Sequence, residues 1–304
     1  MQIPVARPQA SWTPDRASRL KYLCLVPVVL YDSIFFLLPL VFLIWIGFWS
    51  VENYQAVPGF SIANYSDIFS QFFSRSRYAY AIAQSVWVSA TTTLLGLLLC
   101  YPFALGLVFL VPARLQRFAL VLAIAPFWTS YILRLYAWQT VINTNGLLNT
   151  VLLRLGWIDA PLQIIFTQMG TRIGLLHYLA PIMILILYLV LRNIDQTLLK
   201  ASENLGANLW QSFWRVLVPL SRPGLVYCVV FGSIISLGDV LSGIVLGGGT
   251  GKSLLGSFPL FSTVILNEYA ASTNLPRTSA LATLLIGLMV IILVLGLQFA
   301  AIDD

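Results

Sequence analysis

The chain has 304 residues, of which 59% are hydrophobic and only 9% are charged, and its formal net charge is +6. Soluble domains carry about 25% charged residues, so this chain has too few charges to coat a soluble globule. Its basic residues are spread between apolar runs, as in membrane proteins. The composition therefore excludes a secreted enzyme, a disordered scaffold and a nucleic-acid-binding domain.

Six apolar runs follow one another, and each predicts a helix because lipid offers backbone groups no other hydrogen-bond partner. A polar, basic tail, residues 1–21, precedes the first run, which is too long for a signal peptide. The predicted spans are about Tyr22–Trp49, Tyr80–Leu110, Phe118–Val141, Ile173–Leu191, Pro223–Leu246 and Ser279–Ala300. The predicted fold class is all-α integral membrane, with the tail and one six-helix domain, residues 22–304.

The distribution of lysine and arginine predicts the orientation, because cytoplasmic segments carry an excess of positive charge. With the N-terminus inside, ten of these residues fall on inside segments and five on outside segments. Both termini are therefore predicted to be cytoplasmic.

The longest inside loop, residues 193–220, has an amphipathic pattern. Its apolar residues recur at roughly helical spacing, namely Leu198, Leu199, Leu205, Leu209, Phe213 and Trp214. Gly206 is expected to divide the loop into two short helices, and Pro219 to end the pattern before the fifth span. Such a hairpin can lie on the membrane surface or place its apolar face in a groove of a partner; the pattern itself leaves both open.

This loop resembles the EAA loop of permease subunits of binding-protein-dependent ABC importers. The family pattern is Glu-Ala-Ala, three residues, Gly, nine residues and Ile-x-Leu-Pro. Here Lys200-Ala201-Ser202 takes the first place, Gly206 the second and Val216-Leu217-Val218-Pro219 the last. The departure is Lys200, which replaces the usual glutamate; Glu203 lies close enough in sequence to substitute for it.

A second set of motifs resembles the spermidine/putrescine-type subgroup of these permeases. The motifs are PFWTSYILRLYAW at 126–138, NGLLN at 145–149, LGWI at 155–158, Asn64-Tyr65 and PRTSA at 276–280. The resemblance runs from about Leu37 to the end of the chain. It implies a polyamine as the leading substrate; an opine, an amino-acid derivative or an aminophosphonate stays open.

The resemblance also implies a type I ABC importer permease fold, multi-pass in the bacterial inner membrane, that works by alternating access and is not itself an enzyme. The implied partners are a second homologous permease subunit, a dimer of ATP-binding subunits, a periplasmic substrate-binding protein and membrane lipid, with no nucleic acid. ATP and Mg²⁺ belong to the ATPase subunits, and this chain is expected to hold no cofactor. The residues implied in coupling to the ATPase are Ala201, Ser202, Glu203, Gly206, Leu209, Phe213 and Pro219.

Ionisable side chains within spans are costly and usually face the bundle interior. Asp239 is the foremost of these, because it lies deep in its predicted span beside Gly238, where a backbone can approach closely. A carboxylate there offsets part of the desolvation of an ammonium group; an Asp–Arg structural pair is the alternative. The other predicted pathway residues are Asp32, Arg134 and Trp128, the last through cation–π contact. His177 is expected to be an ordinary helix histidine.

The sequence predicts no catalytic or metal site of its own. Its GGGTGKS stretch, 247–253, ends like a P-loop, but Leu246 stands where the first glycine belongs. One histidine argues against a His-based metal site, and Cys24, Cys100 and Cys228 are expected to be small hydrophobic residues in helices. The rival classes are an ion-coupled secondary transporter, favoured by inverted repeats and broken spans, and a membrane-bound enzyme.

Overall fold

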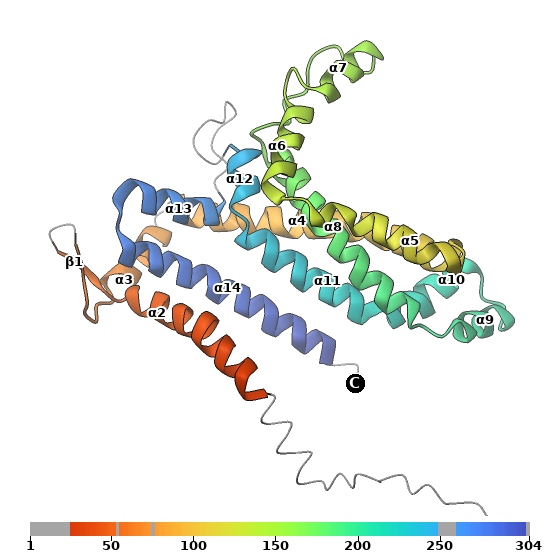
Figure 1. Cartoon of the computed structure of the whole chain (residues 1–304), viewed down its shortest axis with the longest axis horizontal. Coiled ribbons are helices and arrows are strands. Elements are labelled where there is room, and N and C mark those ends of the chain that lie inside the picture. The colour runs from red at the N-terminus through yellow and green to blue at the C-terminus, as the bar shows by residue number, and fades with distance from the viewer. Residues whose placement is uncertain (1–24, 53–54, 74–76, 249–259, 302–304) are drawn as a thin grey trace, which may run out of the picture.

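The computed structural model describes residues 25–52, 55–73, 77–248 and 260–301, which form a bundle of helices (Figure 1). The polar tail, Cys24 and residues 249–253 of the GGGTGKS stretch lie outside the described residues. A short antiparallel hairpin of β1 (Ser50–Glu52) and β2 (Gln55–Val57) joins the first span to the rest. In chain order, the helical elements are η1 (Ser33–Leu37), α2 (Leu38–Ile46), α3 (Ala63–Phe73), α4 (Arg77–Leu105), η2 (Gly106–Leu110), α5 (Ala113–Ile124), η3 (Ala125–Trp128), α6 (Tyr131–Ile142), α7 (Leu147–Arg154), α8 (Gln168–Arg192), α9 (Gln196–Asn204), α10 (Leu209–Ser212), η4 (Phe213–Leu217), α11 (Val218–Gly238), α12 (Leu241–Val245), α13 (Phe261–Ser272) and α14 (Leu275–Ala301).

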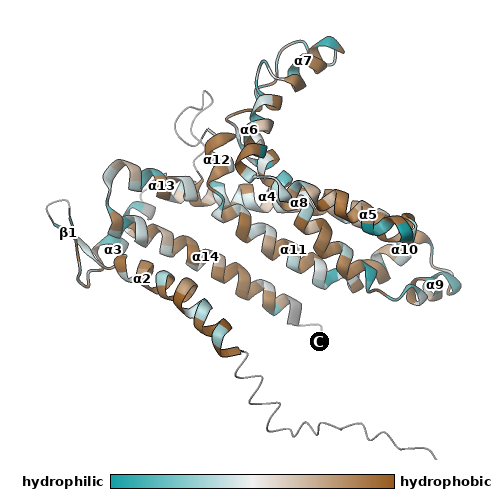
Figure 2. Ribbon diagram, in the orientation of Figure 1, coloured by the Kyte–Doolittle hydropathy of each residue, from teal (hydrophilic) through white to brown (hydrophobic). Residues whose placement is uncertain are grey.

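In the described chain, five helices are long and apolar enough to cross a membrane, and one bent pair makes up to six spans. The five are Leu25–Ile46, Tyr78–Leu110, Gln168–Arg192, Leu209–Gly238 and Leu275–Phe299. Hydrophobic residues predominate along these helices (Figure 2), and many of their large apolar side chains are exposed, as expected for helices that face lipid. The predicted all-α membrane class is therefore confirmed.

The core of the bundle lies where α4, α8 and α11 pack on one another. Leu179, Met183 and Leu187 of α8 are fully buried there, beside Cys100 of α4 and Cys228 of α11. Both cysteines are free and buried, as the sequence predicts. α14 packs on α11, and within the described residues α2 packs mainly on α14, so the first span is almost entirely exposed.

Three π-helical segments each end two residues before a proline, namely Pro39, Pro112 and Pro219. Proline has no N–H, and its ring clashes with the carbonyl four residues earlier, so at Pro39 and Pro219 a locally wider turn accommodates it and the helix continues. At Pro112 the helix ends instead, because Val111 and Pro112 have extended backbone. At Pro112, the side-chain amide of Gln116 donates to that carbonyl, Val108 O, at 2.9 Å. The prediction that Pro219 ends the loop pattern before the fifth span was wrong, because η4 lets the helix run unbroken from Leu209 to Gly238.

The third span also differs from its prediction, which was one helical span over about Phe118–Val141. The chain bends by 91° between Ala113–Trp128 and Tyr131–Arg154. Pro126 lies in the last turn before the bend, and Thr129 and Ser130 have extended backbone, so the helix cannot continue. Consequently α6 and α7 project sideways from the bundle (Figure 1).

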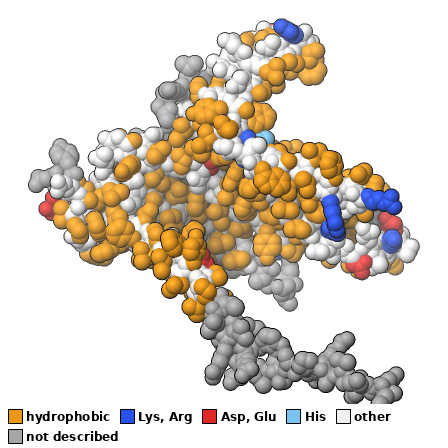
Figure 3. All heavy atoms as spheres, viewed as in Figure 1, with side chains coloured by type: hydrophobic (Ala, Val, Ile, Leu, Met, Phe, Trp, Pro, Cys, Tyr) orange, Lys and Arg blue, Asp and Glu red, His pale blue; other side chains and the backbone are white. Residues whose placement is uncertain are grey.

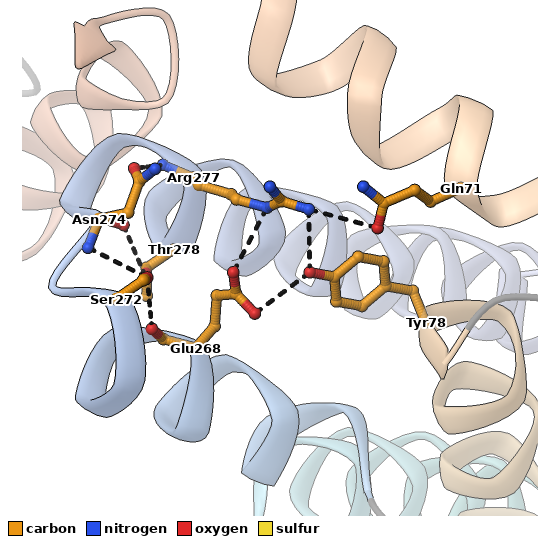
Figure 4. A network of polar contacts seen from close by, with 7 residues as sticks. All are labelled: Gln71, Tyr78, Glu268, Ser272, Asn274, Arg277 and Thr278. Atoms are coloured by element: carbon orange, nitrogen blue, oxygen red, sulfur yellow. Dashed lines mark hydrogen bonds and ion pairs between the residues drawn. The ribbon is translucent and has the colours of Figure 1, made fainter. Parts of the chain in front are cut away.

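A polar network ties four helices together at the end of the bundle opposite α9 (Figure 4). Arg277 of α14 forms an ion pair with Glu268 of α13, with 3.4 Å between Nε and Oε1. Its Nη2 donates to Tyr78 of α4 and Gln71 of α3, both at 3.3 Å, and the Tyr78 hydroxyl donates to Glu268. Since both charges are only about one-fifth exposed, this network fixes α13 against the neighbouring helices.

We expect Gly170→Ala to destabilise the fold, because a Cβ there would lie 2.6 Å from the carbonyl oxygen of Leu246. That carbonyl accepts the Phe166 N–H at 2.7 Å and cannot easily move. Overpacking of this kind costs about 1–3 kcal/mol. The measurement is the melting temperature of the purified transporter, followed by tryptophan fluorescence. Gly287→Ala is the control, since nothing lies within 4 Å of its Cβ; equal melting temperatures for the two variants would contradict the prediction.

Candidate functional site

Asp239 lies at a break between two helices. α11 ends at Gly238, Asp239 has extended backbone (φ −71°, ψ 126°), and the chain becomes helical again at Leu241. The prediction that one continuous helix runs to Leu246, with Asp239 deep inside it, was therefore wrong in this respect. A helix break within the bundle leaves backbone groups that need new partners.

The carboxylate of Asp239 supplies one of those partners. Its Oδ2 accepts the backbone N–H of Ser242 at 2.9 Å and also the Ser242 hydroxyl, and its Oδ1 accepts the Tyr131 hydroxyl at 3.1 Å. The Asp239 carbonyl accepts the hydroxyl of Ser262 at 2.6 Å. Asp239 thus satisfies a free N–H in the first turn of α12 and ties the break to α6 and α13.

A cleft of about 520 Å³ lies beside this carboxylate. The rings of Tyr131 and Tyr178 stand side by side in it, with 4.6 Å between their centroids. Its lining residues are Tyr131, Tyr178, Ile234, Ile235, Gly238, Asp239, Val240, Leu241 and Met289. One acid, two aromatic rings and an apolar wall suit an organic cation with an alkyl chain.

Arg134 lies next to the two tyrosines and is only 9% exposed. Its Cζ is 5.8 Å from the centre of the Tyr131 ring and 6.0 Å from that of Tyr178. Its Nε and Nη1 have no hydrogen-bond partner in the described structure. Tyr131 therefore has a guanidinium over its ring and the Asp239 carboxylate at its hydroxyl, so the two charges are linked through a tyrosine and not by a direct ion pair.

The other predicted pathway residues lie elsewhere. Asp32 is exposed on the first span, and Trp128 is 72% exposed at the end of η3; neither lines the cleft. His177 packs its ring edge-on against Trp138, at 5.9 Å between centroids. Sequence reasoning missed Tyr178 and Ser242, and it passed over Tyr131 although that residue stands within the motif at 126–138.

The loop of residues 193–220 forms a helical hairpin. Asp195 caps α9 by accepting the Thr197 N–H at 2.9 Å, and this hydrogen bond lowers the pKa of the Asp195 carboxyl. Gly206, with φ +85°, makes the turn that the sequence predicts. Asn208 and Gln211 then form a reciprocal capping box at the start of α10.

The hairpin has a fixed shape and an exposed apolar face. The hydroxyls of Ser202 and Ser212 lie 2.7 Å apart and join its two helices. Leu205, Leu209 and Trp210 are 89%, 80% and 68% exposed. Of the residues that the resemblance implies in coupling, Ala201, Ser202 and Glu203 lie on α9, Leu209 opens α10, Phe213 opens η4, and Pro219 lies within the long helix.

The hairpin and the cleft share one helix. The rod from Leu209 to Gly238 begins in the hairpin and ends at Asp239. Near the hairpin, the ring of Phe213 packs on Tyr101 of α4, and the Tyr101 hydroxyl bonds to Ser221 at 2.7 Å. The hairpin is therefore connected to α4 by these contacts and to Asp239 by one continuous helix.

Comparison with known proteins gives a consistent result. Residues 101–303 match the family described as "Binding-protein-dependent transport system inner membrane component". The chain is 34% identical to the spermidine/putrescine transport system permease protein PotB of Haemophilus influenzae, over 80% of this chain and 79% of that protein. It is 31% identical to PotB of Escherichia coli, over 88% and 94%.

Solved structures share the fold. A bacterial alginate ABC transporter in complex with an alginate pentasaccharide-bound periplasmic protein superposes with a TM-score of 0.72 at 16% identity, covering 96% of this chain and 97% of that one. The MetNI methionine ABC transporter gives 0.53 at 17% identity, covering 78% and 98%.

Asp239→Ala should lower the melting temperature of the purified transporter more than Asp239→Asn. Alanine leaves three donors without their acceptor, at about 1–3 kcal/mol for each donor that stays buried and unpaired, whereas asparagine keeps the shape and one acceptor oxygen. Tyr131→Phe, which removes one donor and leaves the acid in place, should have the smallest effect. Equal melting temperatures for all three variants would mean that the carboxylate does not hold the break together.

Proposed function

Because the chain belongs to the family of binding-protein-dependent transport system inner membrane components, we propose that it is the permease through which an ATP-driven importer carries spermidine or putrescine across the bacterial inner membrane. The observation that carries the proposal is the cleft in which Asp239 meets the rings of Tyr131 and Tyr178. The identity to two PotB proteins over most of the chain supports the same substrate class.

The cleft has the features that a polyamine needs. The carboxylate of Asp239 lies at the wall of the cleft, held by Ser242 and Tyr131, and it supplies the negative charge that an ammonium group needs there. The tyrosine rings attract the same cation through their faces. Ile234, Ile235 and Met289 offer an apolar wall to the methylene groups between two amines.

Transport, in this proposal, is alternating access driven by other subunits. A periplasmic binding protein delivers the substrate, a second homologous permease completes the passage, and two ATP-binding subunits hold ATP and Mg²⁺. The exposed Leu205, Leu209 and Trp210 fit a groove on an ATP-binding subunit. The long helix then transmits the movement of the hairpin to the break at Asp239. The proposal has both chain termini and the hairpin on the cytoplasmic side.

One observation favours a different substrate of the same importer type. The Nε and Nη1 of Arg134 are buried without a partner close to the tyrosines, and a carboxylate or phosphonate would bond to them. An opine, an amino-acid derivative or an aminophosphonate is therefore the second candidate. The bent third span resembles the broken helices of ion-coupled transporters, but family membership excludes that class.

The substrate proposal is tested with the complete transporter in nanodiscs with its binding protein. We expect spermidine and putrescine to stimulate ATP hydrolysis and amino-acid derivatives not to do so. Asp239→Asn should weaken the stimulation by about tenfold or more in substrate concentration, because a cation in a desolvated site loses its counter-charge. Asp159→Asn, at an exposed acid away from the cleft, is the control. Stimulation only by a zwitterion or an anion would keep the importer and discard the polyamine.

The coupling proposal is tested at Gly206. Proline cannot adopt φ +85°, so Gly206→Pro should abolish uptake and the stimulation of ATP hydrolysis by substrate while the chain still inserts into the membrane. Gly206→Asn is the matched control, because asparagine tolerates the left-handed conformation. Uptake at the wild-type rate by the proline variant would remove the hairpin from the coupling route.

A further inference from the structure

Three arginines surround a second cavity, of about 290 Å³, between the start of α5 and the end of α8. We call it the arginine pocket; it is lined by Ala113, Arg114, Gln116, Arg117, Tyr188 and Arg192. None of these lining residues is acidic, and Arg114, Arg117 and Arg192 form no ion pair with a carboxylate in the described structure. Within the described residues, no carboxylate therefore neutralises the positive charge of the pocket.

The pocket is held in shape by its neighbours. The Gln116 amide donates to the carbonyls of Val108 and Val111, at 2.9 and 3.0 Å, and so fixes the turn that leads into α5. Arg192 donates to the hydroxyl of the buried Tyr188 at 3.3 Å, with its Cζ 5.9 Å from the centre of that ring. The ring thus holds this guanidinium at the pocket while leaving its other donors available.

The first turn of α5 adds to the positive potential of the arginine pocket. α5 begins after Pro112, and no side chain caps its N-terminus. The N-terminal end of a helix carries a partial positive charge, and here two arginines stand in the first two turns. Guanidinium groups bind phosphate through paired N–H donors. The chemistry of the arginine pocket is therefore that of a phosphate site.

The position of the pocket indicates where the phosphate comes from. It lies at the ends of two apolar helices, Ala113–Trp128 and Gln168–Arg192, which is the level of the lipid headgroups. Figure 3 shows basic side chains gathered at this end of the bundle, beside the apolar surface of the spans. The acidic side chains nearby belong to the hairpin, where Asp195 is engaged as a helix cap.

The surface that leads away from the pocket is apolar. Leu115, Phe118 and Leu122 recur at i, i+3 and i+7 along one side of α5 and are 55%, 68% and 65% exposed. A phosphate in the pocket would have acyl chains running along this stripe. A free phosphate ion, or an acidic patch on a soluble subunit, would leave this apolar stripe uncovered.

We propose that the arginine pocket binds the headgroup phosphate of an anionic phospholipid, whose acyl chains lie along Leu115, Phe118 and Leu122 of α5. Basic pockets between helices at a membrane interface suit such headgroups. The site is separate from the cleft at Asp239, so it does not depend on which substrate the transporter carries.

The test uses the complete transporter in nanodiscs that contain phosphatidylglycerol. The transporter is released from the nanodiscs, and native mass spectrometry measures the lipids that stay bound to it. Arg114→Gln/Arg117→Gln should lower retention of phosphatidylglycerol by about 25-fold, since each arginine near an anionic lipid contributes about fivefold. Arg154→Gln, at an exposed arginine of α7, is the matched control and should retain the lipid as the wild type does. Arg114→Lys/Arg117→Lys should retain part of the binding, because the charge stays and the paired donors are lost.

Three outcomes would overturn the proposal. Equal retention by the wild type and the double glutamine variant would show that the lipid does not bind at these arginines. Displacement of the lipid by millimolar inorganic phosphate or glycerol 3-phosphate would assign the pocket to a soluble phosphate. Loss of the ATP-binding subunit from the double variant, with lipid retention unchanged, would assign the arginines to a subunit interface.

Discussion

Lipid offers no water to a backbone N–H or C=O, so every interruption of a helix in this protein has to be repaired by the protein itself. At two interruptions a side chain supplies the missing hydrogen-bond partner. Gln116 bonds to the carbonyl left free before Pro112, and Asp239 accepts the N–H of Ser242 where α11 stops. At Pro219 the helix is not interrupted, because it widens into a π turn and continues.

The candidate site follows from the same constraint. The break after Gly238 needs a hydrogen-bond acceptor, and a carboxylate meets that need while bringing a charge to the inside of the bundle. Tyr131 comes from α6, which is aimed at the break only because the third span bends by 91°. Asp239 therefore serves both the fold and the cleft. For a variant at this position, stability and transport have to be measured separately.

The rod from Leu209 to Gly238 connects the hairpin with the helix break inside the bundle. Its start carries the apolar hairpin, and its end carries Asp239. Its side contacts, Phe213 on Tyr101 and Tyr101 on Ser221, attach it to α4, which belongs to the buried core. At the far end, the network of Glu268 and Arg277 fixes α13, whose Ser262 holds the carbonyl of Asp239. The break is thus contacted from both ends of the bundle.

By itself, the sequence determined the membrane class, the approximate positions of four of the spans and the Gly206 turn, because these depend on composition, apolar run length and local backbone preference. Asp239 and Arg134 were also singled out, since a charge within an apolar run is visible without a structure. The tertiary structure alone decided three matters: the bend at Thr129 and Ser130, the unbroken helix through Pro219, and the meeting of Tyr131 and Tyr178 with Asp239. Each depends on partners distant in the chain or on a choice between two permitted backbone geometries. An apolar run shows that a helix is stable in lipid, but only the packing of neighbouring helices decides where that helix bends and which polar groups it brings together.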